Sequence, residues 1–301
     1  MDPAARDKVL RAYALSTAAG MTPMRALAAA WLAHLDYARL DIEATTRHVG
    51  LALAHSSREQ NCARSRAGLV VAQALHLAGR YDLAAPWYAR VRGRAIEEGD
   101  DATTGAVLHN MAWLHMYTVR QASFTGRVGS PESAHALTSA ESTKNFDELF
   151  GVSSSAGLEP MLRAQVLSLR GNAAEALALY ERHLPQACFR GALRLRGNLL
   201  ADQAWCRAVL GDHSRAREDA VAASSSLDAE TQVDDRAAAH SRLAQVFMAL
   251  GDVDDMERHR QFAANAWRSF SELQIRIIEL LGEISDGLIR VGGFKPEAQQ
   301  C

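Results

Sequence analysis

The sequence predicts an all-α protein built from a repeated pair of helices. Its 301 residues include 56 Ala, 30 Arg and only three Lys, with seven Pro and 6% aromatic residues, which is a composition typical of helices. Apolar residues recur with helical periodicity along the whole chain, and no alternating run of β-branched residues is long enough for a sheet. Turn formers punctuate this pattern at short intervals, as at Gly79-Arg80, Gly171-Asn172, Gly211-Asp212 and Gly251-Asp252.

Several segments align with one another around these glycines. In residues 75–91, 167–184, 206–223 and 246–263, a Gly ends one helix and a second helix follows at once. Seven residues before the Gly stand Ala72, Ala164, Ala204 and Ala244. Five residues after it stand Ala84, Ala176 and Ala216, with Met256 as the exception. Two antiparallel helices can approach closely only where their side chains are small, which explains the alanines. We expect each Gly to form a left-handed turn between the paired helices, because glycine adopts that backbone conformation without strain.

The spacing of the turns extends the pattern beyond these segments. Gly171, Gly211 and Gly251 are 40 residues apart, Val119 lies 40 after Gly79, and Leu40 lies 39 before it. Only the step from 119 to 171 is longer, at 52 residues. An insertion of about 12 residues is therefore expected near 123–159, where Gly and Ser are abundant.

This pattern resembles the tetratricopeptide repeat (TPR), in a longer bacterial form of about 40 residues. The turn Gly79-Arg80-Tyr81, with Ala84 and Tyr88 on the next helix, shows the resemblance most fully. It covers residues 22–268, or about six helix pairs, although the family's first-helix aromatic and closing Pro are mostly missing. The resemblance implies a right-handed α-solenoid, with residues 1–301 forming a single domain. Outside the repeats, within residues 1–20, residues 3–19 are predicted to form an additional amphipathic helix that caps the N-terminal pair.

The last predicted helix, 269–291, is apolar on two faces and precedes a polar tail, 292–301. One stripe follows a heptad spacing and contains Phe270, Leu273, Ile277, Leu280, Ile284 and Val291. A second stripe contains Ile278, Leu281 and Leu288. A helix of this kind packs on two partners. It can cap the last repeat, form a homodimer through residues 270–291, or connect to an output domain.

Charge, cysteine content and N-terminal sequence exclude several functions and locations. With 33 basic and 35 acidic side chains the net charge is −2, so we expect no nucleic-acid partner and no attraction to an anionic membrane. The four Cys show no metal-ligand spacing, and no basic stretch precedes an apolar one at the N-terminus. The uncharged run 102–119 contains too many polar residues to cross a membrane. These features, with Arg and Ala in abundance, are typical of a cytoplasmic bacterial protein.

No residue pattern predicts catalysis, a metal or a cofactor. The glycines of residues 126–130 and 290–296 do not match a phosphate-binding loop. His109 and His115 are six residues apart, so they lie on different faces of a helix rather than together as metal ligands. An all-helical enzyme is therefore the least favoured class.

The resemblance implies that the first helix of each pair lines a concave groove. The residues 13, 10, 6 and 3 positions before each turn would face it: His34, Tyr37, Arg66, Gln73, His76, His109, Trp113, Met116, Gln165, Ser168, Asn198, Trp205, Gln245 and Met248. Aromatic rings with amides and histidines can stack on side chains and hydrogen-bond an extended backbone. As alternatives, Trp113 and Trp205 belong to the core, and His109 bonds to neighbouring helices.

These observations favour a scaffold or adaptor that binds a protein or peptide segment in its groove and performs no chemistry. The alternative is a ligand-sensing regulatory domain of a bacterial signalling or transcription-control system. In that case a small molecule would bind, and the C-terminal helix would couple to a dimer or an output partner.

Overall fold

The computed structural model describes residues 4–57, 61–124, 158–189, 192–228 and 231–291, and this part of the chain is helical with no β-strand. Its first half contains α1 (Ala5–Ala18), α2 (Thr22–Tyr37), α3 (Ile42–His55), α4 (Asn61–Leu77), α5 (Tyr81–Glu98) and α6 (Asp101–Phe124). Its second half contains α8 (Glu159–Leu169), α9 (Ala173–Phe189), the 3₁₀ turn η1 (Ala192–Leu195), α10 (Arg196–Val209), α11 (His213–Ser225), α12 (Val233–Ala249) and α13 (Val253–Val291). The predicted insertion, apart from its ends, and the predicted tail lie outside the described residues.

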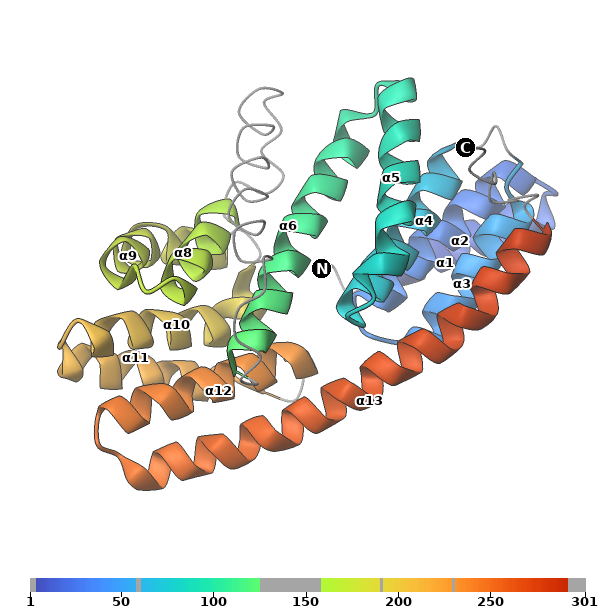
Figure 1. Ribbon diagram of the computed structural model, residues 1–301. Coiled ribbons are helices and arrows are strands. Elements are labelled where there is room, and N and C mark those ends of the chain that lie inside the picture. Colours follow the sequence, from blue (N-terminus) through green and yellow to red (C-terminus); the bar gives the residue numbers. More distant parts are fainter. Residues whose placement is uncertain (1–3, 58–60, 125–157, 190–191, 229–230, 292–301) are drawn as a thin grey trace, which may run out of the picture. The chain divides into compact units, whose positions relative to one another are not determined.

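The chain divides into two compact units (Figure 1), with residues 1–107 and 273–301 in unit 1 and residues 108–272 in unit 2. In unit 1, α2 packs against α1, α3 and α4, and α4 also packs against α3 and α5. In unit 2, α10 packs against α8, α9, α11 and α12. The prediction of an all-helical protein whose neighbouring helices pack together is confirmed.

Five turns adopt the left-handed conformation that the spacing predicts. Gly79, Gly171, Gly211 and Gly251 have φ values of 75°, 84°, 87° and 75°. Leu40, at the corresponding position, has a φ of 56°, although a side chain disfavours that conformation. After each of them, the next backbone N–H bonds to a carbonyl oxygen five residues earlier, as from Arg80 to Leu75 at 2.9 Å. The predicted turn positions are therefore confirmed at these five places.

The turn expected at Val119 does not exist. Helix α6 continues without a break from Asp101 to Phe124. A β-branched residue is among the least able to adopt a left-handed backbone, and no Gly or Asn stands nearby to replace it. The local residues around 119 therefore favour a continuous helix over the turn that the 40-residue spacing predicts.

The small residues beside the turns are buried where the helices approach. Ala72, Ala164 and Ala204 are 0% exposed, and so are Ala84, Ala176 and Ala216. Ala244 and Met256, at the last turn, remain partly exposed. Close packing of the helix pairs thus depends on alanine at most of the predicted positions.

The C-terminal helix differs from its prediction at its start. Helix α13 runs unbroken from Val253, so there is no boundary at 268/269. Of its predicted seam, Phe270 and Ile277 are 2% and 0% exposed. Within unit 1, Gln274 Nε2 donates to the Leu77 carbonyl oxygen at 2.9 Å, and Arg276 pairs with Glu43 at 2.9 Å. This part of α13 therefore packs on its own chain, and a homodimer through residues 270–291 stays a prediction.

Within the described ranges, none of the helices combines the length and apolar character that crossing a bilayer requires.

Candidate functional site

The predicted groove residues lie on α2, α4, α6, α8, α10 and α12, the first helices of the predicted pairs. Partly exposed are His34, Tyr37, Arg66, His109, Trp113, Trp205 and Gln245. Buried are Gln73, His76, Met116, Gln165, Ser168 and Asn198, whereas Met248 is exposed. A polypeptide cannot reach a buried side chain unless the surroundings of that side chain move, so the part of the predicted groove open to a peptide is the first set together with Met248.

In unit 1, the structure brings two of these residues to an exposed tryptophan. Arg66 Cζ lies 3.5 Å from the ring centroid of Trp31, and the His34 ring meets the Trp31 ring edge-on at 5.9 Å. Burial and the positive charge of Arg66 both lower the pKa of His34, so the imidazole is neutral at pH 7. Trp31 is 38% exposed. We call Trp31, His34 and Arg66 the tryptophan patch.

Two buried polar contacts in unit 1 hold helices together. Asp36 on α2 accepts from Arg6 Nε on α1 at 2.7 Å and lies 2.6 Å from His48 Nδ1 on α3. Burial alone would raise the pKa of Asp36, but the hydrogen bonds from His48 and Arg6 keep it below its ordinary value. His76 on α4 approaches the Tyr88 hydroxyl on α5 at 3.5 Å. These groups connect neighbouring helices, and all of them except the partly exposed Arg6 are buried.

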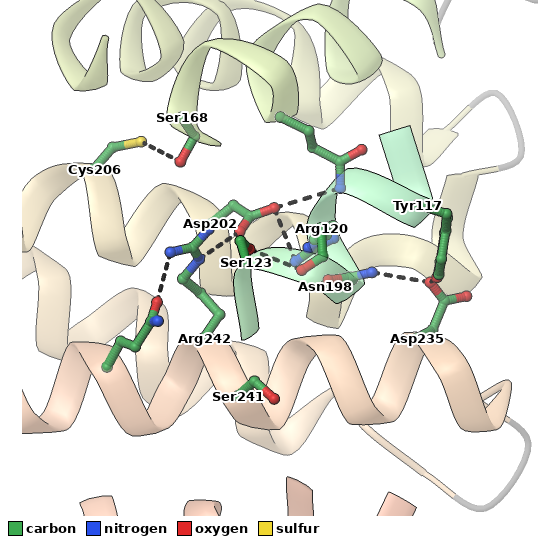
Figure 2. A network of polar contacts seen from close by, with 12 residues as sticks. Tyr117, Arg120, Ser123, Ser168, Asn198, Asp202, Cys206, Asp235, Ser241 and Arg242 are labelled. Carbon is green, nitrogen blue, oxygen red and sulfur yellow. Dashed lines mark hydrogen bonds and ion pairs between the residues drawn. The ribbon is translucent and has the colours of Figure 1, made fainter. Parts of the chain in front are cut away.

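In unit 2, a buried carboxylate gathers polar side chains from four helices. Asp202 on α10 accepts from Arg242 Nε on α12 at 2.9 Å through Oδ1. Its Oδ2 lies 3.0 Å from Nη2 of Arg120 on α6 and 3.4 Å from Nε2 of Gln165 on α8. Arg242 Nη1 also donates to Gln245 Oε1 at 2.6 Å. We call these five residues the Asp202 network (Figure 2).

A second buried carboxylate extends the contacts along the same helices. Asp235 on α12 accepts from the Tyr117 hydroxyl on α6 and from Asn198 Nδ2 on α10, the latter at 2.9 Å. Tyr117 and Arg120 are three residues apart, and Asn198 and Asp202 are four apart, so each pair shares one helix face. Polar side chains thus meet at two places along the buried faces of α6, α10 and α12, one around Asp202 and the other around Asp235.

Aromatic rings cover the two arginines of the Asp202 network. Arg242 Cζ lies 5.3 Å from the ring centroid of Trp205 and 5.0 Å from the ring centroid of Phe124. Arg120 Cζ lies 5.7 Å from the same Phe124 centroid. Trp205 therefore contacts the network while packing against the apolar core of unit 2. Trp113 packs on the same core and stacks with His109 at 6.3 Å. Both tryptophans have a core role and a partly exposed ring.

Several buried groups of unit 2 make no hydrogen bond to any residue that the structure describes. They include Arg120 Nε and Nη1, His109 Nδ1, Gln165 Oε1, Asn198 Oδ1, the Tyr180 hydroxyl and Asp234 Oδ1. Arg120 is 1% exposed and Tyr180 is 0% exposed. Each unmade bond of a buried polar group costs about 1–3 kcal/mol, so folded proteins seldom leave such groups without a water molecule or a ligand.

Unit 2 also contains a buried cysteine. Cys206 donates to Ser168 Oγ at 3.6 Å, and burial raises the pKa of its thiol to about 11. A thiol that stays protonated at neutral pH is a poor nucleophile. Across the helices whose side chains are described, no three His, Cys, Asp or Glu residues gather as metal ligands.

The predicted groove residues do not include Asp202, Arg242 and Trp31, although these three lie at the same distance from a turn. Each stands nine residues before a turn, at 211, 251 and 40, and the groove rule does not include that position. The signal that could have found two of them is the repeat length itself. Asp202 and Arg242 have opposite charges and are 40 residues apart, so a 40-residue repeat places them side by side. Arg120 carries no such signal, because it follows the missing turn.

The chain matches no protein-family model, and comparison with curated proteins finds no relative. The tryptophan patch and the Asp202 network are therefore the features of this chain that point to a function.

The Asp234→Asn substitution is expected to stabilise the protein above pH 7. Burial and the adjacent Asp235 raise the pKa of Asp234 to about 7, well above its value in an unfolded chain. The folded state therefore keeps a proton that the unfolded state releases between about pH 4 and 7, and stability falls as the pH rises through that window. Asparagine removes the cost of the buried charge, so the variant should exceed the wild type by about 1–3 kcal/mol at pH 8. The gain should vanish near pH 4.

Asp254→Asn is the matched control for this comparison. Helix α13 begins with Val253-Asp254-Asp255 as α12 begins with Val233-Asp234-Asp235, but Asp254 is exposed. Thermal melts of the three proteins from pH 4 to 8 test the prediction. Equal gains for both substitutions, or a gain that does not depend on pH, would contradict it.

Proposed function

We propose that the chain is a non-catalytic, TPR-like α-solenoid of the bacterial cytoplasm that binds a protein or peptide segment. The repeated left-handed turns and the packing of α2 with α3, α4 with α5 and α10 with α11 support the solenoid. Helix pairs stacked in this way present a preorganised surface, so a partner binds without first having to order its receptor.

The tryptophan patch is the observation that carries this proposal. It belongs to α2 and α4, two of the helices whose faces would line the groove. Arg66 holds its guanidinium against one face of Trp31 and so preorganises both side chains. Trp and Arg are the residue types that dominate binding hot spots, because they combine a large apolar area with directed polar contacts. A peptide segment with an apolar anchor suits this patch.

A ligand-sensing domain is the second candidate function. The Asp202 network favours it, since a buried cluster of charged groups with unused hydrogen-bonding capacity suits a small molecule better than a peptide.

Site-specific photo-crosslinking tests the first candidate. With benzoylphenylalanine in place of Trp31, the full chain should form adducts with a second polypeptide in cells that produce it. Arg66→Ala in the same chain should reduce the yield, because it removes the group that orients the patch.

Trp87 provides the matched control. It lies on α5, a second helix of its pair, and Arg90 Cζ covers its ring at 4.6 Å much as Arg66 covers Trp31. Crosslinking from position 87 should give no adduct. The absence of adducts from position 31, or equal yields from both positions, would overturn the peptide-binding proposal.

A further inference from the structure

Hydrogen-bonding capacity is left over around one side of the Asp202 network. Asp202 uses both carboxylate oxygens, on Arg242 through Oδ1 and on Arg120 and Gln165 through Oδ2. Arg120 then still has Nε and Nη1 without an acceptor, although the residue is 1% exposed. Gln165 keeps Oε1 without a donor.

Other buried groups near the Arg120 guanidinium supply no hydrogen-bond acceptor for its Nε and Nη1. Asp235 lies within electrostatic reach of Arg120, but its Oδ1 accepts from Tyr117 and Asn198. The fully buried Tyr180 hydroxyl feels the charges of Asp202, Arg120 and Arg242 and has no hydrogen-bond partner. Phe124 contributes only an aromatic face to Arg120.

We infer that Arg120, Gln165 and Tyr180 form a buried binding site for the oxyanion of a small molecule, either a carboxylate or a phosphate. Nε and Nη1 donate from different edges of the guanidinium, so each can donate to one oxygen acceptor, and the group keeps its positive charge at any working pH. The Tyr180 hydroxyl can add a further donor, and Gln165 Oε1 can accept from a hydroxyl or amino group of the ligand. This inference names the ligand class of the sensor function and rests on that second candidate.

Ligands that differ in one group test the inference on the wild-type full chain. Lactate and inorganic phosphate should each be compared with lactamide and with chloride at constant ionic strength, so that screening does not change. A ligand that binds only the folded state raises the melting temperature of the protein. Once the site is saturated, this increase grows with the logarithm of the ligand concentration. We expect lactate or phosphate, but not lactamide or chloride, to raise it. Whichever of the two raises the melting temperature shows whether the site takes a carboxylate or a phosphate.

Hydrogen exchange places the site without any substitution. The effective oxyanion should slow exchange in peptides from α6 and α8, which carry Arg120 and Gln165, but not in peptides from α11. Arg120→Lys keeps the charge beside Asp202 and should weaken binding by about tenfold or more. Arg163→Gln, on the exposed face of α8, should leave it unchanged.

The outcomes separate the site from its role. The inference is wrong if neither oxyanion raises the melting temperature, or if Arg163→Gln weakens binding as much as Arg120→Lys. In that case water molecules accept the hydrogen bonds of Arg120 Nε and Nη1. If an oxyanion binds at α6 and α8 without changing the oligomeric state or the helix order of the full chain, the site stands and the sensor function fails.

Discussion

Replacing Asp202 with alanine is expected to destabilise the protein by about 3–5 kcal/mol, because it leaves two arginines buried without a counter-ion. Asp202 lies within 3.0 Å of nitrogens from both Arg120 and Arg242, and all three side chains are less than 10% exposed. Removing one partner of a buried ion pair costs far more than the pair contributes, since the remaining charge keeps its desolvation penalty. Denaturant unfolding followed by circular dichroism measures the loss.

The comparison needs a matched ion pair at the surface. Asp255 and Arg258 pair at 2.8 Å on α13, but Arg258 is largely solvated, so Asp255→Ala should cost at most about 1 kcal/mol. A double variant, Asp202→Leu with Arg242→Met, should recover part of the loss, because it removes two opposite charges together. A small effect of Asp202→Ala would show that water reaches the arginines and that the network is not dry.

The turns were predictable from the sequence because they depend on local chemistry. Gly211 adopts a positive φ that other residues resist, and Asp212 after it accepts a hydrogen bond from the Arg215 N–H at 3.3 Å, which starts α11. A backbone requirement of this kind shows in the residue type. At position 40 it does not, since Leu40 adopts the turn conformation only because the packed helices on either side impose it. The repeat spacing, not the residue, located that turn.

The candidate site was less predictable because it depends on which faces become buried. Gln165 and Asn198 are polar, and a polar residue on a repeat helix is expected to face a groove. The structure turns both inward, where Asp202 and Asp235 take up their amide N–H groups. Polarity alone cannot separate an exposed polar face from a buried network. The 40-residue spacing of Asp202 and Arg242 does distinguish a buried network from an exposed polar face, since it pairs opposite charges on neighbouring helices.

Replacing Ala204 with leucine is expected to cost about 1–3 kcal/mol, because the larger side chain has no room between the packed helices. Ala204 is 0% exposed in the middle of α10, the helix that packs against α8, α9, α11 and α12. Leucine is a good helix former, so the loss reports on packing and not on helix propensity. The expected result is a lower midpoint of denaturant unfolding with an unchanged slope.

Two further alanines decide whether this effect belongs to the repeat. Ala176 and Ala178 lie on the same helix, α9, but Ala176 is 0% exposed at a repeat position and Ala178 is exposed outside it. Ala176→Leu should therefore destabilise the protein much as Ala204→Leu does, whereas Ala178→Leu should change stability by about 0.5 kcal/mol or less. Similar losses at 176 and 178 would mean that small residues beside the turns do not set the approach of the helices. The spacing that locates the turns would then carry no information about packing.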